Sequence, residues 1–322
     1  MRDVLIALGM GGPDSISAIE PFLANMLSDR KLINFGLGEG LQNIIANFIA
    51  SRRAKKLAPQ YEKMGGRSPQ LRLTEALFEK VSVKYAEKTS FGLDTYPAMC
   101  YWHPLIRHTA YQLAEKNRNA KHRRIILFPL YPQYSSVTTG ICFNLIREAI
   151  AEIPPYSPVV EIYNYHLYKP YLELLAKRIH AGASKIGKQP KDVHILFSAH
   201  SLPKAIIDKG DPYVKQITEQ CVKLVDMVKP KSFSLAYQSK FGRGKWLSPS
   251  VKDELVSLAH RGVRNVVVLA LSFVSDNIET LIELDEDLLG EGEMLGLNIA
   301  RAEMPNDSDD FVDAIVGLIS EI

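Results

Sequence analysis

The chain has 322 residues, of which 46% are hydrophobic and 23% charged, with 20 glycines and 18 prolines. This composition excludes disordered, collagen-like and low-complexity proteins, and the length favours two domains or one internally duplicated domain. The 39 basic and 36 acidic residues leave a net charge of only +3. Because no basic run alternates with aromatic residues, nucleic acid is not an expected partner.

The cellular compartment is suggested by two further features. No stretch approaches the roughly 18 apolar residues that cross a membrane, and the N-terminal apolar run is too short for a secretory signal. Cys100, Cys142 and Cys221 lie too far apart in the sequence for a disulfide framework or a CxxC metal motif. We therefore expect a protein of a reducing compartment, the cytoplasm.

Short apolar runs rich in β-branched residues alternate along the chain with helical patterns. The predicted strands are residues 3–8, 95–101, 124–130, 159–165, 193–199, 232–237, 265–271 and 295–302. The predicted helices are residues 16–27, 41–57, 71–88, 170–180, 212–228 and 250–259.

This alternation predicts an α/β protein with parallel sheets and right-handed crossovers. The strands are mostly apolar rather than alternating, so helices should cover both faces of each sheet. Four strands precede Tyr165 and four follow it, which predicts two similar halves, each a four-stranded parallel sheet flanked by helices. We place the domains at 1–155 and 156–322, near a proline cluster, with the last helix, about 308–322, packing back on the first lobe.

Ligands of open parallel sheets bind beyond the carboxyl ends of the strands. His200 follows one predicted strand directly, and Glu279 follows another in the same half. A buried histidine satisfied by the backbone is an equally good interpretation of His200 alone. The glycines of LGMGGP lack the GxGxxG spacing, so we expect no nucleotide and no other organic cofactor.

Acidic residues recur around Glu279 at helical spacing. Asp276, Glu279, Glu283 and Asp287 would span an arc of about 80° on an α-helix, opposite a set of apolar residues. A solvated acidic face is one interpretation, and a path that attracts and delivers a divalent cation is the other. Neutral imidazole with carboxylate suits Fe(II), Zn(II) or Co(II).

A set of motifs resembles the ferrochelatase family in order over nearly the whole chain. They are LGMGGPDS (8–15), PFLANMLSDR (21–30), SPQLRLT (68–74), YWHP (101–104), LYPQYS (130–135), TTG (138–140), FSAHSLP (197–203), GDPY (210–213), YQSKFG (237–242), KWL (245–247) and SFVSDNIETLIELD (272–285). The resemblance implies a chelatase-like fold of two Rossmann-like lobes with a porphyrin cleft between them. It also implies a lyase of haem biosynthesis that inserts Fe(II) into protoporphyrin IX, or a related porphyrin, and releases two protons.

The resemblance also implies roles for individual residues. His200 would be the essential catalytic and metal-binding histidine, Glu279 its carboxylate partner, and Asp276 with Glu283 an auxiliary acidic path. The motif positions associated with the porphyrin pocket are Met10, Ser68, Tyr101, Tyr131, Tyr213 and Trp246. We expect His200 and Glu279 to face each other across a gap wide enough for a tetrapyrrole.

Four positions depart from the usual family pattern. Cys100 stands where arginine is common, Arg67 where glycine is usual, Asn277 where the helix motif has histidine, and Arg243 where proline is common. Losing the arginine affects recognition of a porphyrin carboxylate, and Asn277 cannot relay a proton. Two alternatives therefore stay open: a tetrapyrrole carrier or sensor without turnover, and a cobalt chelatase of a sirohydrochlorin-type ring.

One apolar helical face bears on membrane contact. Leu41, Ile44, Ile45, Phe48 and Ile49 precede Arg52, Arg53, Lys55 and Lys56. We favour a core-facing helix with a basic C-terminal end, and peripheral membrane contact is the alternative. The chain lacks the C-terminal cysteine cluster of some relatives, so no iron–sulfur cluster is expected, and the oligomeric state is left open.

Overall fold

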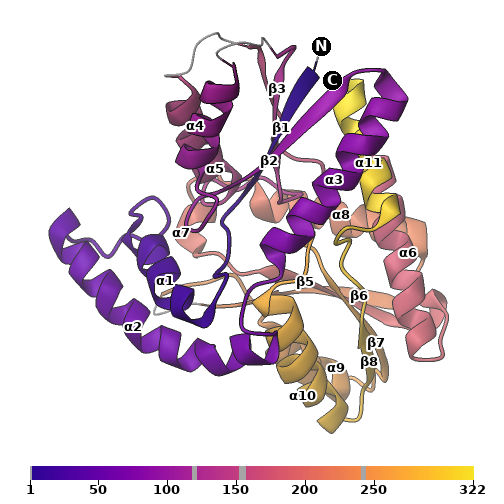
Figure 1. Cartoon of the computed structure of the whole chain (residues 1–322). Coiled ribbons are helices and arrows are strands. Elements are labelled where there is room, and N and C mark those ends of the chain that lie inside the picture. The colour runs from indigo at the N-terminus through magenta and orange to yellow at the C-terminus, as the bar shows by residue number, and fades with distance from the viewer. Residues whose placement is uncertain (1, 118–121, 152–156, 241–243) are drawn as a thin grey trace. The chain divides into compact units, whose positions relative to one another are not determined.

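The computed structural model describes residues 2–117, 122–151, 157–240 and 244–322 (Figure 1). Contacts divide the chain into two compact units. The first comprises Met1–Tyr131, Ser135–Tyr163 and Ile315–Ile322, and the second Pro132–Tyr134 and Asn164–Ala314. The domain boundary that we predicted at residues 155 and 156, and Arg243, lie outside the described residues.

The first unit is built on a four-stranded parallel sheet in the order β2-β1-β3-β4. Its strands are β1 (Arg2–Gly9), β2 (Gly92–Met99), β3 (Ile125–Pro129) and β4 (Val159–Glu161). β4 pairs with β3 from Ile125 opposite Val159 onward, so this unit extends past β4 to Tyr163.

The second unit repeats this plan, with a parallel sheet in the order β6-β5-β7-β8. Its strands are β5 (His194–His200), β6 (Ser232–Gln238), β7 (Asn265–Ala270) and β8 (Asn298–Arg301). In both units the first strand in the chain lies inside the sheet with the second on its outer side. The predicted pair of similar four-stranded parallel sheets is therefore confirmed.

Helices cover both faces of the first sheet (Figure 1). The helices of the first unit are η1 (Ile16–Ala18), α1 (Ile19–Ser28), α2 (Glu39–Lys63), α3 (Gln70–Thr89), α4 (Ile106–Asn117) and α5 (Thr139–Ile150), of which α3, α4 and α5 lie against the sheet. Val4, Ile6 and Leu8 of β1 pack with α4 and α5 on one face. On the other face the ring of Phe78 from α3 meets that of Phe128 from β3, with centroids 5.7 Å apart. Burial on both faces is the reason why these strands are continuously apolar.

The second sheet is covered in the same way. Its helices are α6 (Lys169–Lys185), η2 (Pro190–Asp192), α7 (Lys204–Ile207), α8 (Tyr213–Val228), α9 (Val251–His260), the π-helix η3 (Glu279–Leu288), α10 (Leu289–Met294) and α11 (Asp309–Glu321). α6 approaches β7 closely, because a Cβ atom on Gly182 would lie 2.9 Å from Cγ1 of Val267. α11 begins in the second unit, and its residues from Ile315 onward belong to the first.

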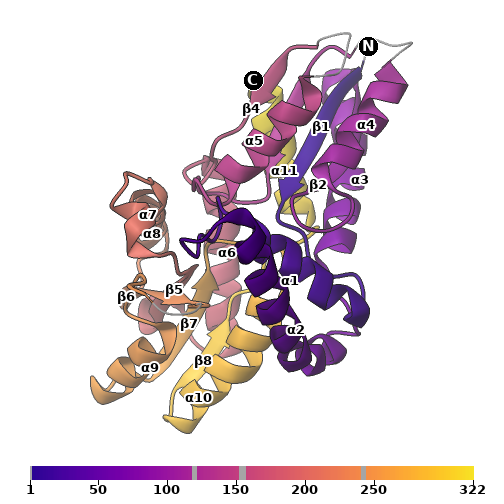
Figure 2. The same cartoon turned by 90° about the vertical axis from the view of Figure 1, so that its left-hand side faces the viewer.

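The exposed face of α2 corrects one expectation. Figure 2 shows α1 and α2 side by side, and α2 buries the small residues Ala46 and Ala50. Leu41, Ile44 and Phe48 are instead 57%, 68% and 57% exposed, so the core-facing interpretation is wrong for them. Alanines make the close helix contact because they let the backbones approach, which turns the bulky apolar side chains outward.

A buried charge network ties β1 to its surroundings, and its removal yields a prediction. The fully buried carboxylate of Asp3 accepts hydrogen bonds from Tyr85 Oη at 2.6 Å, Arg124 Nε at 3.0 Å and Arg123. Asp3→Ala leaves both guanidinium groups without their carboxylate, so we expect a loss of about 3–5 kcal/mol of unfolding free energy in urea titrations. Asp94→Ala, which breaks a more exposed pair with Arg2 at the same sheet, should cost under about 1 kcal/mol. Equal losses would contradict this account.

Candidate active site

The carboxyl ends of neighbouring strands β5 and β7 position His200. His200 is the last residue of β5, and its backbone N–H donates to Oγ of Ser272, which follows β7, at 3.0 Å. The hydroxyl of Tyr213, from α8, donates to the carbonyl oxygen of His200 at 3.0 Å and lies 2.6 Å from the Ser272 hydroxyl. Both backbone groups of His200 are therefore held.

Ser272 was not singled out in the sequence, although the segment that contains it was. Its position two residues beyond the end of β7 is the signal that could have identified it. Its hydroxyl joins the ends of the neighbouring strands β5 and β7. This contact cannot be inferred from the sequence until the strand order is known.

The imidazole of His200 is partly exposed and chemically available. Its ring meets that of Phe273 edge-on, with centroids 6.0 Å apart. Nδ1 is buried and has no hydrogen-bond partner among the described residues. Burial lowers the pKa of His200 to about 4, because it penalises the charged form. The ring is therefore neutral at physiological pH and can accept a proton or bind a metal.

Glu279 begins η3, which is wound as a π-helix rather than as the α-helix that the acidic spacing predicted. π-helical turns are rare and occur frequently at functional sites. Burial raises the pKa of Glu279 to about 7. A hydrogen bond from the backbone N–H of Glu279 lowers this pKa in part, and the nearby charge of Glu283 raises it further. The carboxyl group is therefore close to half-ionised at neutral pH.

The other acidic residues of the predicted stripe differ in their surroundings. The carboxylate of Glu283 accepts hydrogen bonds from the backbone N–H of Ser239, at 2.8 Å, and from the Ser239 hydroxyl. Ser239 lies just beyond β6, so this contact joins η3 to a third strand end. Asp287 is exposed to solvent.

Asp276 precedes η3 instead of lying on it, which corrects its predicted place on a helical stripe. It accepts hydrogen bonds from the Thr280 hydroxyl at 2.9 Å and from Nδ2 of Asn306 at 2.7 Å. It also lies 3.0 Å from the guanidinium of Arg301, which binds Asp285 as well. The carboxylate is thus held by a cation and two neutral donors.

The largely buried side chain of Arg301 makes a second stability prediction. Arg301→Ala removes the cation shared by Asp276 and Asp285, so we expect a loss of about 3–5 kcal/mol of unfolding free energy. Thermal or urea unfolding measures it. Lys185→Ala, which breaks the exposed pair with Glu303 in the same unit, is the control and should cost under about 1 kcal/mol. A loss for Arg301→Ala no larger than that of the control would refute the role assigned to Arg301.

Asn277, where the family usually has histidine, caps the start of η3. Its Oδ1 accepts from the backbone N–H of Thr280 at 3.0 Å, and its own N–H donates to the Thr280 hydroxyl at 3.0 Å. The side chain is 3% exposed, and Nδ2 has no partner among the described residues. Asn277 therefore fixes the backbone just before Glu279.

In the first unit, three predicted porphyrin residues lie along the carboxyl edge of the sheet. The backbone N–H of Met10 donates to the Tyr131 hydroxyl at 2.9 Å, and the Met10 carbonyl accepts from the N–H of Tyr101 at 3.1 Å. Tyr101 is 4% exposed, and its hydroxyl donates to Asp29 at 2.7 Å. Burial, with this bond, raises the pKa of Tyr101 far above its usual range.

The remaining predicted residues lie in surface segments. Ser68 donates its backbone N–H to Pro13 at 2.8 Å, and a Cβ atom on Gly12 would lie 2.6 Å from its hydroxyl, so glycine permits this approach. In the second unit, Trp246 is half-buried and forms a β-bridge with Pro203, three residues after His200.

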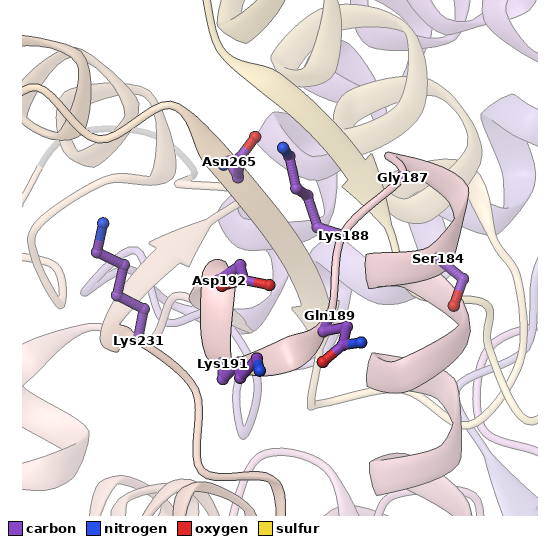
Figure 3. Close-up of a pocket in the computed structure, with 8 residues that line it drawn as sticks. All are labelled: Ser184, Gly187, Lys188, Gln189, Lys191, Asp192, Lys231 and Asn265. Carbon is purple, nitrogen blue, oxygen red and sulfur yellow. The ribbon is translucent and has the colours of Figure 1, made fainter.

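The described residues offer no additional site, either as a metal-binding group or as a hollow. No group of three His, Cys, Asp or Glu side chains there is arranged to hold a metal ion. An open hollow of about 1000 Å³ lies at the opposite end of β5 from His200, lined by Lys188, Lys191 and Lys231 (Figure 3). These lysines are exposed, so we assign no site to the hollow.

Comparisons with known proteins bear on the family and the fold of this chain. Residues 2–322 match the family described as "Ferrochelatase". A ferrochelatase of Geotalea daltonii is 35% identical over 100% of this chain and 98% of its own length, and one of Aquifex aeolicus is 37% identical over 99% of each.

Among solved structures, SirB from Bacillus subtilis with Fe³⁺ matches with a TM-score of 0.57 at 11% identity, covering 100% of this chain and 95% of its own. CbiX, the terminal enzyme of siroheme biosynthesis in denitrifying bacteria, matches with a TM-score of 0.55 at 13% identity, over 100% and 99%. Because the sequence identity to these two proteins is so low, the structural match shows a shared fold and nothing more. The full-length match to the family and the identity to its members show that the chain belongs to the ferrochelatase family.

Proposed function

We propose that the protein inserts Fe(II) into protoporphyrin IX, or a related porphyrin, to form haem. The observation that carries this proposal is the neutral imidazole of His200, whose buried Nδ1 has no partner among the described residues. It follows a strand of the same sheet as the segment that leads to Glu279. Together they offer an unprotonated imidazole and a carboxyl group that is close to half-ionised at neutral pH.

The reaction explains why such groups are needed. Two pyrrole N–H protons occupy the position that the metal must take, so insertion requires that both leave while iron loses its water. We propose His200 as the first proton acceptor and Glu279 as the carboxylate that exchanges protons with it or binds iron. A carboxyl group near half-ionisation at pH 7 can do either without a large energetic cost.

The acidic path is proposed to continue from Glu279 to Glu283. Ser239 holds the Glu283 carboxylate in place, which keeps a negative charge near the start of η3. Asp276 adds charge before the helix but is bound by Arg301, so we propose that it mainly orients the segment.

Porphyrin contact is proposed for the partly exposed residues of the predicted set. Met10, Ser68, Tyr131 and Trp246 are partly exposed, and their apolar or hydroxyl groups suit a flat ring. Tyr101 and Tyr213 are buried, and their hydroxyls are bound to Asp29 and to the His200 carbonyl. We propose that these two tyrosines position neighbouring groups instead.

Fe(II) enters as substrate, and we propose no organic cofactor. We also propose that the chain holds no iron–sulfur cluster. Such a cluster is usually bound by four cysteines, but this chain has three, and one of them, Cys221, lies in the second unit.

Turnover tests the proposal against the carrier and the cobalt chelatase. Purified protein is mixed with protoporphyrin IX and Fe(II), or Zn(II) as an air-stable substitute, and the metalloporphyrin absorbance is followed. Product that grows to many equivalents per protein supports the enzyme, whereas a change that stops at one equivalent supports a carrier. Preference for Co(II) and a sirohydrochlorin-type ring in competition would favour the cobalt chelatase.

We further propose a cytoplasmic location with peripheral contact between α2 and anionic lipid. None of the described helices is long and apolar enough to cross a membrane. The exposed Leu41, Ile44 and Phe48 precede basic residues in the interior of α2, which continues to Lys63, and Arg52 lies over the Phe48 ring at 4.3 Å. Such a helix suits the interface of an anionic bilayer.

Vesicle flotation tests this contact. We expect the protein to float with phosphatidylglycerol vesicles and the variant Ile44→Ser with Phe48→Ser to bind several-fold less. Met294→Ser, at the most exposed methionine of the second unit, is the control and should bind like the wild type. Equal binding by all three proteins would exclude α2 as the contact.

A further inference from the structure

Two cysteines from distant parts of the sequence meet in the first unit. The sulfur atoms of Cys100 and Cys142 lie 3.2 Å apart, and both residues are free thiols. Cys100 directly follows β2, and Cys142 lies in the first turns of α5. Cys142 is fully buried, whereas Cys100 is partly exposed.

A metal site is the less favoured explanation of this pair. Among the described residues, no third His, Cys, Asp or Glu side chain completes a metal-binding group with the two sulfur atoms. Soft metals such as zinc take four ligands in structural sites. Two thiols alone, at a separation about 1 Å longer than an S–S bond, instead suit reversible bond formation.

We propose that Cys100 and Cys142 are a redox-sensitive modification site, which hydrogen peroxide converts to a disulfide. Cys100 sulfur attacks one oxygen of the peroxide, the O–O bond breaks, and a sulfenic acid and one water result. Cys142 sulfur then attacks the sulfenic sulfur, the S–S bond forms, and a second water leaves. Two thiols and one peroxide become one disulfide and two waters, and the two electrons pass to the peroxide.

The surroundings determine how readily the pair reacts. Cys142, by its hydrogen bond, and burial raise the pKa of Cys100 well above its usual value. Since the thiolate is the reactive form, oxidation should be slow at neutral pH and should accelerate as pH rises. The buried Cys142 sulfur is already in place, so a sulfenic acid at Cys100 is captured before it oxidises further.

The position of the pair connects it to the proposed porphyrin residues, and this step rests on the proposed function. The backbone N–H of Cys100 donates to the Gly9 carbonyl at 2.9 Å, and the next residue, Tyr101, donates to Met10 at 3.1 Å. Closing the S–S bond pulls Cys100 toward α5 and with it the segment bonded to Met10. We expect the oxidised protein to bind porphyrin several-fold more weakly.

Intact-mass spectrometry tests disulfide formation without any activity measurement. After peroxide treatment, the wild type and Cys221→Ser should each lose about 2 Da and recover it with dithiothreitol. Cys100→Ser and Cys142→Ala should not lose mass, and peptide mapping should link residues 100 and 142. A wild type that keeps its mass, or that gains only oxygen, would overturn the proposal, as would the same mass loss in Cys142→Ala.

Porphyrin fluorescence titration tests the effect on binding. The reduced and oxidised wild type should differ several-fold in Kd, while Cys142→Ala should show the same Kd before and after peroxide. A disulfide that forms without changing Kd would refute the link to porphyrin binding. Reduced protein that binds no porphyrin would instead refute the proposed function, and the mass experiment would still decide the disulfide.

Discussion

Replacing His200 by alanine is expected to lower kcat by about 10²–10⁴-fold, the range typical of a lost general base. Porphyrin affinity should change little, because the substitution leaves the backbone contacts of residue 200 with Ser272 and Tyr213 in place. Metalloporphyrin formation measures kcat, and fluorescence quenching measures binding.

A matched control lies on the same strand. His194, at the other end of β5, is buried, its pKa is likewise lowered to about 4, and its ring contacts Ser232 and Ser234 at 2.8 Å each. His194→Gln should retain kcat per folded molecule. Full activity of His200→Ala, or an equal loss in both variants, would show that the catalytic role assigned to His200 is wrong.

Replacing Glu279 by glutamine is expected to reduce kcat by about 10²-fold and to flatten its pH dependence. The raised pKa, about 7, means that the wild-type carboxyl is protonated below this pH and ionised above it. If the ionised carboxylate is the catalytically active form, the kcat of the wild type should rise between pH 6 and 8, and the kcat of Glu279→Gln should not.

Unfolding provides a second measurement on the same variant. A carboxyl whose pKa is raised on folding contributes stability below its unfolded pKa and loses it as pH rises through the folded value. The unfolding free energy of Glu279→Gln minus that of the wild type should therefore be larger at pH 8 than at pH 5, by on the order of 2 kcal/mol. Glu286→Gln, an exposed position of the same helix, should change neither profile. A wild-type-like pH profile for Glu279→Gln would contradict the assignment.

The sheets were predictable from local patterns. Strands buried on both faces must be continuously apolar, so residues 3–8 and 193–199 could be recognised as strands without knowledge of their neighbours. The six predicted helices are also present, although the apolar face that was expected to be buried in α2 is the exposed one. The order of strands within each sheet depends on pairing, which periodicity does not encode.

The candidate site was only partly predictable. His200 was identifiable because it ends a strand, but Ser272 and Tyr213, which hold its backbone, come from segments more than ten residues away in the chain. The acidic spacing around Glu279 predicted an α-helix, whereas Glu279 begins a π-helix, so the side-chain pattern did not reveal the winding. Exposure of Ile44 and Phe48 likewise depends on which face of α2 meets α1.

By itself, the sequence determined the class of fold, the two matching halves and the motifs of the family, since each follows from residues close together in the chain. Only the tertiary structure decided that Arg301 binds the carboxylate of Asp276 and that Cys100 meets Cys142. The physical reason is that the energy of an interaction between two side chains depends on their distance in space, which their separation along the chain does not determine.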